Sequence, residues 1–120
     1  ERLILDTCAR LGWTRRAIGD DEILERMNFP MVNEGARILE ERIAARPGDI
    51  DVVWLYGYGW PVYRGGPMYD ADRIGLKYIA DRLAFYAIAT NDPSLEPAPL
   101  LRRLAAEGGT FASLADRKAP

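Results

Sequence analysis

The 120-residue sequence contains no histidine. Histidine is the side chain that ordinarily gains or loses a proton near neutral pH, and it is the commonest metal ligand in proteins. Its absence excludes a catalytic triad built on histidine, a histidine general base and the common histidine-containing zinc sites within this chain. Cys8 is the single cysteine, so no disulfide can form within the chain, which fits a reducing compartment.

Long apolar runs and a strong charge imbalance are also missing. No run approaches the roughly 20 apolar residues that a helix needs to span a bilayer. The net charge of −2 gives no basic face of the kind that nucleic-acid binding requires. The sequence begins with glutamate and shows no secretory signal. Its length is that of one domain, and we expect residues 1–120 to be a single helical domain, a fragment of a longer protein, with residues 1–19 and 115–120 peripheral.

Apolar residues recur at helical rather than alternating spacing along most of the chain. With the interruptions by glycine and proline, this spacing predicts helices over residues 1–11, 20–43, 47–57, 67–73, 76–89 and 100–107. Residues 94–99 are predicted to form an extended connector, and Phe111 and Leu114 to pack back onto the body. The predicted fold is all-α: a bundle of about five helices, two of them long, around a turn rich in glycine, proline and aromatic residues.

The helix predicted from residue 20 has one apolar stripe, which we expect to face the core. The stripe consists of Ile23, Leu24, Met27, Met31, Gly35, Ile38, Leu39 and Ile43. A solvated face is expected opposite, made of Glu34, Arg37, Glu40, Glu41 and Arg42. Asp20, Asp21 and Glu22 suit the positive end of the helix dipole, so we interpret them as capping residues, and a metal site is the alternative.

The most unusual stretch is residues 57–67, where four glycines and two prolines are interleaved with Tyr58, Trp60 and Tyr63. Glycine loses more backbone freedom on folding than any other residue, so ordering this stretch is costly. It is also too apolar for a solvated linker. We predict a packed turn that joins two helices and is held by its own aromatic side chains, with Trp54 of the preceding helix buried.

Two features of this turn could indicate an anion site. Gly57 and Gly59 are expected to end the preceding helix, because glycine tolerates the left-handed conformation. A phosphate cradle is the alternative, but the pattern lacks the third glycine and the Lys-Ser/Thr of nucleotide motifs, and it follows a helix rather than a strand. Arg64 could contact an anionic ligand, although we favour packing on an aromatic ring or bonding to turn carbonyls.

The same stretch has a specific family resemblance. Its letters D-I-D-V-V-W-L-Y-G-Y-G-W-P-V-Y-R-G-G-P-M, at positions 49–68, are followed by Ala71-Asp72 and Gly75-Leu76. Upstream lie I-L-E-R at 23–26 and V-N-E-G-A-R-I-L-E-E at 32–41. Over residues 20–83 the chain resembles the 3-hydroxyacyl-CoA dehydrogenase C-terminal domain, in particular its second copy in multifunctional fatty-acid β-oxidation proteins. The matched positions are Arg26, Asn33, Glu34, Gly35, Asp49, Asp51, Gly57, Gly59, Trp60, Pro61, Arg64, Gly65, Gly66, Pro67 and Asp72.

The resemblance implies that the chain is the C-terminal fragment of a larger multidomain enzyme. This parent would oxidise 3-hydroxyacyl-CoA with NAD, with enoyl-CoA hydratase activity in multifunctional members. In that family a separate nucleotide-binding domain holds NAD and supplies a His-Glu pair, and helical C-terminal domains follow. The first copy closes over the acyl-CoA substrate and the second packs against the first, whereas single-copy relatives dimerise through the same helical face. The resemblance assigns no catalytic, cofactor-binding or metal residue to this chain. Glu25 departs from the asparagine that the substrate-side copy often has there.

We therefore expect the matched positions to shape the turn and a mating surface, with Asn33 and Glu34 bonding the backbone of the turn. The leading hypothesis is a non-catalytic structural module that pairs with upstream dehydrogenase domains. A second is a free-standing, self-associating interaction module with an apolar surface made of Met27, Met31, Trp54, Tyr58 and Trp60. A third is an acyl-CoA-binding surface around Arg64. Lys118-Ala119-Pro120 is not a peroxisomal address, which favours a bacterial cytoplasm, with the peroxisome as the alternative.

Overall fold

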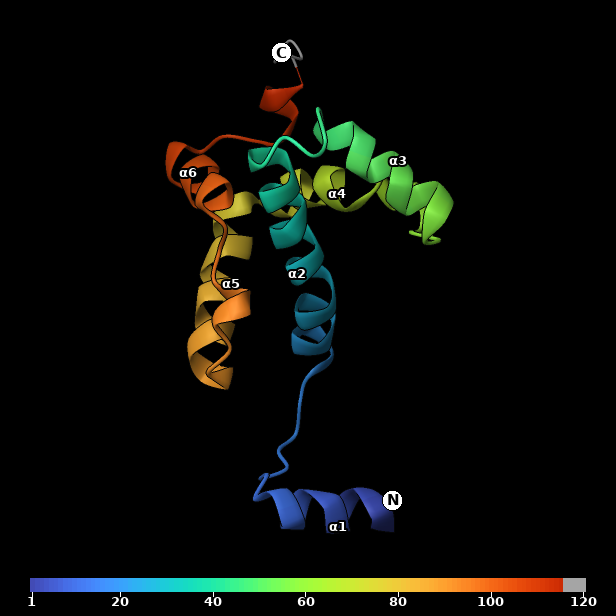
Figure 1. Cartoon of the computed structure of the whole chain (residues 1–120), viewed down its shortest axis with the longest axis vertical. Helices are drawn as coiled ribbons and strands as arrows, with labels where there is room; N and C mark the ends of the chain where they lie inside the picture. Colours follow the sequence, from blue (N-terminus) through green and yellow to red (C-terminus); the bar gives the residue numbers. More distant parts are fainter. Residues whose placement is uncertain (116–120) are drawn as a thin grey trace.

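A computed structural model describes residues 1–115, and the regular secondary structure of this part is all helical (Figure 1). Its α-helices are α1 (Arg2–Leu11), α2 (Asp20–Glu40), α3 (Pro47–Gly57), α4 (Pro67–Ile74), α5 (Leu76–Thr90) and α6 (Pro99–Glu107). Short 3-10 turns are η1 (Val62–Arg64), η2 (Pro93–Leu95) and η3 (Ala112–Leu114). The predicted all-α fold is confirmed, with six α-helices in the described residues rather than about five. None of these helices is long and apolar enough to cross a membrane.

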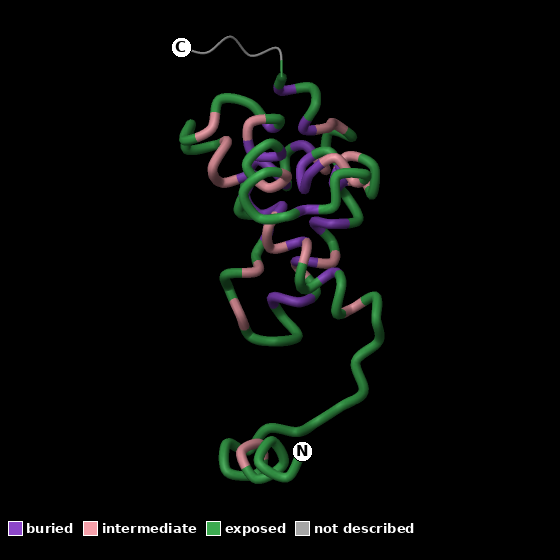
Figure 2. The backbone as a smooth tube through the Cα atoms, turned by 90° about the vertical axis from the view of Figure 1, so that its right-hand side faces the viewer, coloured by how far each residue is buried: buried purple, intermediate pink, exposed green. Residues whose placement is uncertain are grey.

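The helices from α2 onward pack into one body (Figure 1). α2 lies against α4, α5 and α6, and α3 packs on α4 at one end of this group. Buried backbone is concentrated in this body, whereas α1 and the segment 12–19 are set apart from it and are exposed almost throughout (Figure 2). The core residues include Phe29, Val32, Ala36, Ile50, Met68, Ala71, Leu76, Ile79, Leu83, Leu101, Leu104 and Phe111.

Helix ends follow local sequence. Proline is the first residue of α3, α4 and α6, a position where the missing N–H is not needed within the helix. α1 and α6 end at Gly12 and Gly108, both in the left-handed conformation. The predicted ranges 47–57, 67–73 and 76–89 are therefore confirmed to within one residue. Phe111 and Leu114 are buried as predicted. Predictions for residues 116–120, including Lys118-Ala119-Pro120, lie outside the described residues.

The predicted orientation of α2 is right only toward its C-terminal end, where Gly35 is buried and Ile38 and Leu39 pack against the core. Its buried residues are Glu25, Phe29, Val32, Asn33, Gly35 and Ala36. In the predicted stripe, Ile23, Leu24, Met27 and Ile43 are instead exposed, and Ile43 lies beyond the end of the helix. The reason is that two polar residues of α2 find hydrogen-bond partners on distant segments, and these contacts turn the helix so that only part of the apolar stripe meets the core.

Candidate functional site

Glu25 is the centre of a buried polar cluster between α2 and α5. Only 7% of its surface is exposed, and its carboxylate accepts hydrogen bonds from the hydroxyls of Tyr78 and Tyr86 and from Nε of Arg82. The Arg82 guanidinium also lies over the Tyr86 ring, 4.7 Å from its centroid. Burial alone would raise the pKa of Glu25, but these three donors hold the pKa of its carboxyl below the ordinary value. The cluster fixes α2 against α5.

Sequence reasoning missed Glu25 as an organising residue. It was noted only as a departure from the family pattern, and its three partners lie 53 to 61 residues further along the chain. The acidic residue in helical register with Phe29 and Val32 was the available signal, because a carboxylate on a buried face must be paired. The groups of Tyr78, Arg82 and Tyr86 that face Glu25 all donate to its carboxylate, so the cluster serves the packing of α2 on α5.

Asn33 joins α2 to the connector before α6. Its Nδ2 donates to the carbonyl of Glu96 at 2.8 Å, and its Oδ1 accepts from the backbone N–H of Ala98 at 2.7 Å. Asn33 therefore does bond backbone, but of the proline-rich connector and not of the glycine-rich turn, so that prediction is wrong. Glu34 contacts neither segment; it is exposed and pairs with Arg37 at 3.1 Å.

Asp51 joins α3 to the start of α4. Its carboxylate accepts hydrogen bonds from the backbone N–H groups of Met68 at 2.7 Å and Tyr69 at 3.1 Å. These are among the first N–H groups of α4, which have no partner within the helix, so Asp51 caps α4 from another helix. Burial raises the pKa of its carboxyl, and the two N–H donors oppose that rise.

Gly66 makes this cap possible. A Cβ atom at this position would lie 2.4 Å from Cβ of Asp51, and the φ angle of Gly66 is +98°. Any other residue would meet both the carboxylate and an unfavourable backbone conformation. Gly35 is constrained in a similar way on α2, where a Cβ would lie 2.5 Å from Sδ of Met68. Both matched glycines therefore allow close approach of neighbouring helices.

Arg64 is engaged within the domain. Its guanidinium pairs with Asp70 at 2.5 Å and lies 5.7 Å from the centroid of the Trp60 ring. Trp60 is buried, and its Nε1 has no acceptor in residues 1–115. This is the aromatic packing that the sequence favoured, and it leaves Arg64 poorly placed to receive an anionic ligand.

The other matched residues shape helix ends and turns. Asp72 accepts from the backbone N–H groups of Phe111 and Ala112 at 2.7 and 2.9 Å, which ties the C-terminal segment to α4. Asp49 accepts from the N–H of Arg46 and so caps its own helix, α3. The left-handed glycine after α3 is Gly59, with φ of +72°, rather than Gly57, which is still helical. Finally, Arg26 pairs with Glu22, Pro61 precedes η1, Gly65 ends η1 with φ of +79°, and Pro67 opens α4.

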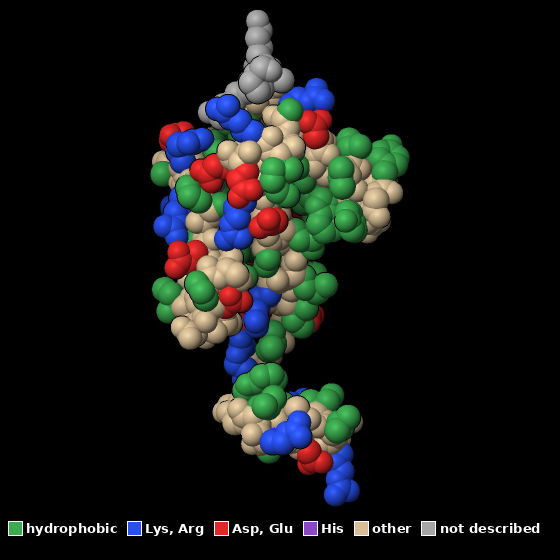
Figure 3. All heavy atoms as spheres, viewed as in Figure 1, with side chains coloured by type: hydrophobic (Ala, Val, Ile, Leu, Met, Phe, Trp, Pro, Cys, Tyr) green, Lys and Arg blue, Asp and Glu red, His purple; other side chains and the backbone are tan. Residues whose placement is uncertain are grey.

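The prediction that aromatic side chains hold the turn is right in part, because the rings of Tyr58 and Trp60 lie against Trp54, with centroids 4.9 and 6.1 Å away. Tyr58 and Tyr63 are exposed, and Trp54 is only half-buried. The tip of α3 and η1 instead forms a projecting apolar surface, here called the aromatic arm: Tyr56, Tyr58, Val62 and Tyr63. Figure 3 shows it as the hydrophobic region at the upper right of the body. Between 72% and 88% of each of these four residues is exposed.

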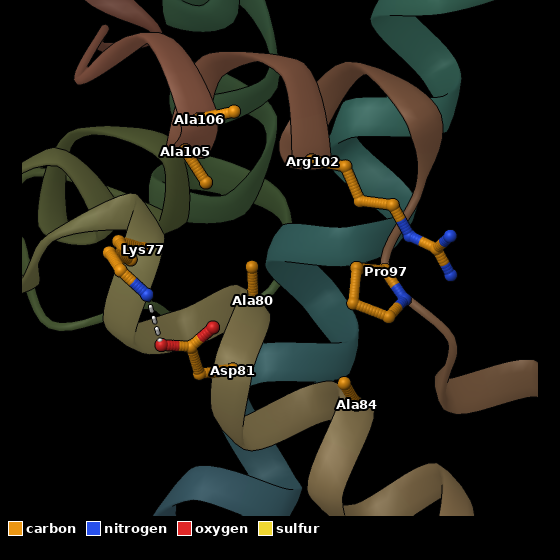
Figure 4. A pocket seen from close by; sticks show the side chains of 8 residues that line it. All are labelled: Lys77, Ala80, Asp81, Ala84, Pro97, Arg102, Ala105 and Ala106. Atoms are coloured by element: carbon orange, nitrogen blue, oxygen red, sulfur yellow. Dashed lines mark hydrogen bonds and ion pairs between the residues drawn. The ribbon is translucent and has the colours of Figure 1, made fainter.

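A shallow pocket of about 290 Å³ lies between α5 and α6 (Figure 4). Alanine methyl groups and Pro97 line it, with Lys77, Asp81 and Arg102 at its edges. The Nζ of Lys77 bonds to Asp81 at 2.7 Å, and Arg102 pairs with Glu96 at 3.3 Å. The pocket therefore presents methyl groups and paired charges rather than a nucleophile beside a base.

The described residues do not fit a dinucleotide or a metal. Gly57 and Gly59 lie at the C-terminal end of α3, where carbonyl oxygens are free, whereas a phosphate binds the N–H groups of a helix N-terminus. Within residues 1–115 no group of three or more histidine, cysteine, aspartate or glutamate residues is placed to hold a metal ion. The acidic residues 20–22 lie in the first turn of α2, where they suit the helix dipole, but the N-cap position is Gly19 and no side chain caps the helix there, so that part of the prediction is wrong.

Comparison with known proteins identifies the family. The description "3-hydroxyacyl-CoA dehydrogenase, C-terminal domain" matches residues 23–112. The chain is 50% identical over 101 residues to the peroxisomal bifunctional enzyme of Danio rerio, and 49% identical over 94 residues to that of Homo sapiens. These alignments cover 83% and 78% of this chain but only 14% and 13% of the relatives.

A plant relative gives a shorter match. The glyoxysomal fatty acid beta-oxidation multifunctional protein MFP-a of Brassica napus is 46% identical over 66 residues, which are 55% of this chain and 9% of the relative. The resemblance seen in residues 20–83 is thus confirmed, and the family match extends further, through α6 to η3. The chain belongs to the 3-hydroxyacyl-CoA dehydrogenase C-terminal domain family.

Proposed function

We propose that this chain is a non-catalytic, domain-pairing part of an NAD-dependent 3-hydroxyacyl-CoA dehydrogenase of fatty-acid β-oxidation. The parent would be multifunctional and would also carry enoyl-CoA hydratase activity. The relatives named above support this, since they are called bifunctional or multifunctional enzymes and the matched parts are only 9% to 14% of their lengths. NAD and the acyl-CoA substrate would bind to other domains of that parent.

The aromatic arm is the observation on which the pairing role rests. Three of the matched polar residues, Asn33, Asp51 and Asp72, are engaged by backbone groups of other segments inside the body, which suits a structural role. The arm is the opposite case, because four large apolar side chains project together into solvent. Contiguous exposed apolar patches of this kind mark interaction sites in proteins. We propose that the matched residues of the turn, from Gly57 to Pro67, serve to present this arm.

The first test is enzymatic. Purified chain should neither bind NAD in a calorimetric titration nor reduce it when supplied with a 3-hydroxyacyl-CoA. Hydride transfer above the rate of buffer alone would contradict the non-catalytic role. A titration with acyl-CoA tests the third hypothesis at the same time, and we expect no heat of binding because Arg64 is already paired with Asp70.

The second test concerns the arm. Tyr63→Ala should weaken association with the upstream dehydrogenase domains of the parent, because interface aromatics dominate binding free energies. Ile88→Ala is the matched control: Ile88 lies on α5 outside the arm and is exposed to a similar degree. Equal effects of the two substitutions would contradict pairing through the arm.

The alternative function is a free-standing module that self-associates. The same arm favours it, because the arm of a second copy could cover it. Sedimentation of the pure chain distinguishes the two: a dimer that Tyr63→Glu dissociates supports self-association, and a monomer that binds dehydrogenase domains supports the main proposal. The sequence favoured a bacterial cytoplasm over the peroxisome. The names of the relatives, peroxisomal and glyoxysomal, favour the peroxisome instead.

A further inference from the structure

α1 is a helix without a partner. Its residues Ile4, Cys8 and Leu11 follow each other at spacings of four and three and so share one face. None of the residues of α1 is buried. Isolated helices shorter than about 12–15 residues are only marginally stable in water, and α1 has ten. This helix therefore needs an apolar surface to pack on.

The first three turns of α2 offer such a surface. Leu24, Met27 and Met31 follow each other at spacings of three and four on the flank of α2 that points away from Glu25. Leu24 and Met27 are 54% and 62% exposed, and Met31 is partly exposed. Farther along α2 the same flank is covered, because Gly35 lies against Met68. Figure 3 shows hydrophobic side chains on the right-hand flank of the body below the arm. We call Leu24, Met27 and Met31 the open flank.

The connection between the two helices suits a hairpin. Arg16 pairs with Glu22, which holds the end of the segment 12–19 against the first turn of α2. Only a short stretch then has to turn for α1 to run antiparallel to α2. In that arrangement the C-terminal end of α1 comes beside the first turn of α2, which carries Asp20 and Asp21. The negative end of the α1 dipole would then lie near the positive end of the α2 dipole.

The lengths and spacings also match. Ten residues of helix extend about 15 Å, which is the length of α2 from residue 20 to residue 30. In an antiparallel pair, Leu11 would face Leu24, Cys8 would face Met27 and Ile4 would face Met31. All three contacts belong to one register, because the residue numbers in each pair have the same sum. A helix pair of arbitrary sequence would not bring three apolar pairs into one register.

We propose that α1 folds back antiparallel on α2 and covers the open flank in this register. The set-apart position of α1 in Figure 1 is then the open form of a hairpin that closes. The inference goes beyond domain pairing, because it needs no other part of the parent protein and uses a surface separate from the aromatic arm.

Disulfide trapping tests the register directly, since Cys8 is the only native cysteine. In Met27→Cys, mild oxidation should join Cys8 to the new thiol within one molecule, because facing positions of packed helices can reach disulfide geometry. The control is Val62→Cys on the aromatic arm, which is exposed and lies on η1, outside both helices of the hairpin. We expect closure in the first variant at least about tenfold faster than in the control, read by non-reducing electrophoresis and by mass after alkylation.

Two results would overturn the proposal. One is intramolecular closure in Met27→Cys no faster than in Val62→Cys. The other is a product dominated by disulfide-linked dimers, which would mean that α1 covers the flank of a second copy. A second measurement needs no new cysteine: Cys8 should react with a thiol reagent several-fold faster in Leu24→Glu than in the unchanged chain, whereas the exposed α5 control Ile88→Glu should leave the rate unchanged. Equal rates in Leu24→Glu and the unchanged chain would also refute closure.

Discussion

Removing the Glu25 carboxylate is the sharpest test of how the body is held together. Glu25→Ala leaves the hydroxyl of Tyr86 without its acceptor, and Tyr86 is almost completely buried. It also removes the partner of Arg82, but about a third of that side chain is exposed, so water can replace part of the loss. Breaking a fully buried ion pair costs about 3–5 kcal/mol, and the exposure of Arg82 moves the expected loss toward about 3 kcal/mol.

Urea denaturation gives the measurement, followed by circular dichroism and by the fluorescence of Trp54 and Trp60. A loss of about 3 kcal/mol is a large part of the roughly 5–15 kcal/mol that stabilises an ordinary domain. The control is Glu34→Ala, which removes an exposed pair with Arg37 and should cost at most about 0.5 kcal/mol.

A double-mutant cycle isolates the buried contact. Tyr86→Phe alone should cost about 1 kcal/mol, because it removes one hydrogen bond of Glu25. In the Glu25→Ala background the same change should cost nothing or restore stability, since the hydroxyl no longer has its acceptor. Additive effects, or a cost of Glu25→Ala as small as that of Glu34→Ala, would refute the role assigned to this cluster.

Three further predictions follow from the same contacts. Gly66→Ala should destabilise the fold by about 3 kcal/mol, because its Cβ would meet Asp51 at a backbone angle that favours glycine. The control is Gly48→Ala in α3, where a Cβ meets open space, and it should be neutral or slightly stabilising in the same urea titration. Phe111→Ala should cost about 3–5 kcal/mol, because this side chain is completely buried; a cost below about 1 kcal/mol would show that the C-terminal segment is not part of the core. The pKa of Glu25 is lowered in the fold, so the stability that its carboxylate contributes is complete above the unfolded pKa of about 4.3 and is lost as the pH falls through the folded pKa. Glu25→Gln should therefore reduce the fall in unfolding free energy at acid pH, and an unchanged fall would contradict this.

Local signals explain why the helix boundaries could be predicted. Pro47, Pro67 and Gly75 interrupt helical spacing at the points where helices begin or end, and these effects depend on neighbouring residues only. The sequence offered both Gly57 and Gly59 for the left-handed residue after α3, because glycine is equally suited to it at either position; in the structure it is Gly59, beside the buried Trp60.

The orientation of α2 and the structure of the turn could not be predicted in this way. Glu25 and Asn33 face the interior because of partners on α5 and the connector before α6, more than 50 residues along the chain. An apolar stripe shows that a helix has a face to bury, but not what will cover it. Tyr58 and Tyr63 gave a misleading signal for the same reason: aromatic residues suit a core and an interaction surface equally well.

The measurement that tests the central proposal most directly is the intact mass of the native polypeptide that contains this sequence, taken from its source cells. As a non-catalytic domain of a multifunctional β-oxidation enzyme, the chain should occur in a polypeptide several-fold heavier than its own 13.5 kDa, in keeping with relatives of which it spans about one seventh. A native mass near 13.5 kDa would contradict that proposal and would favour the free-standing, self-associating module.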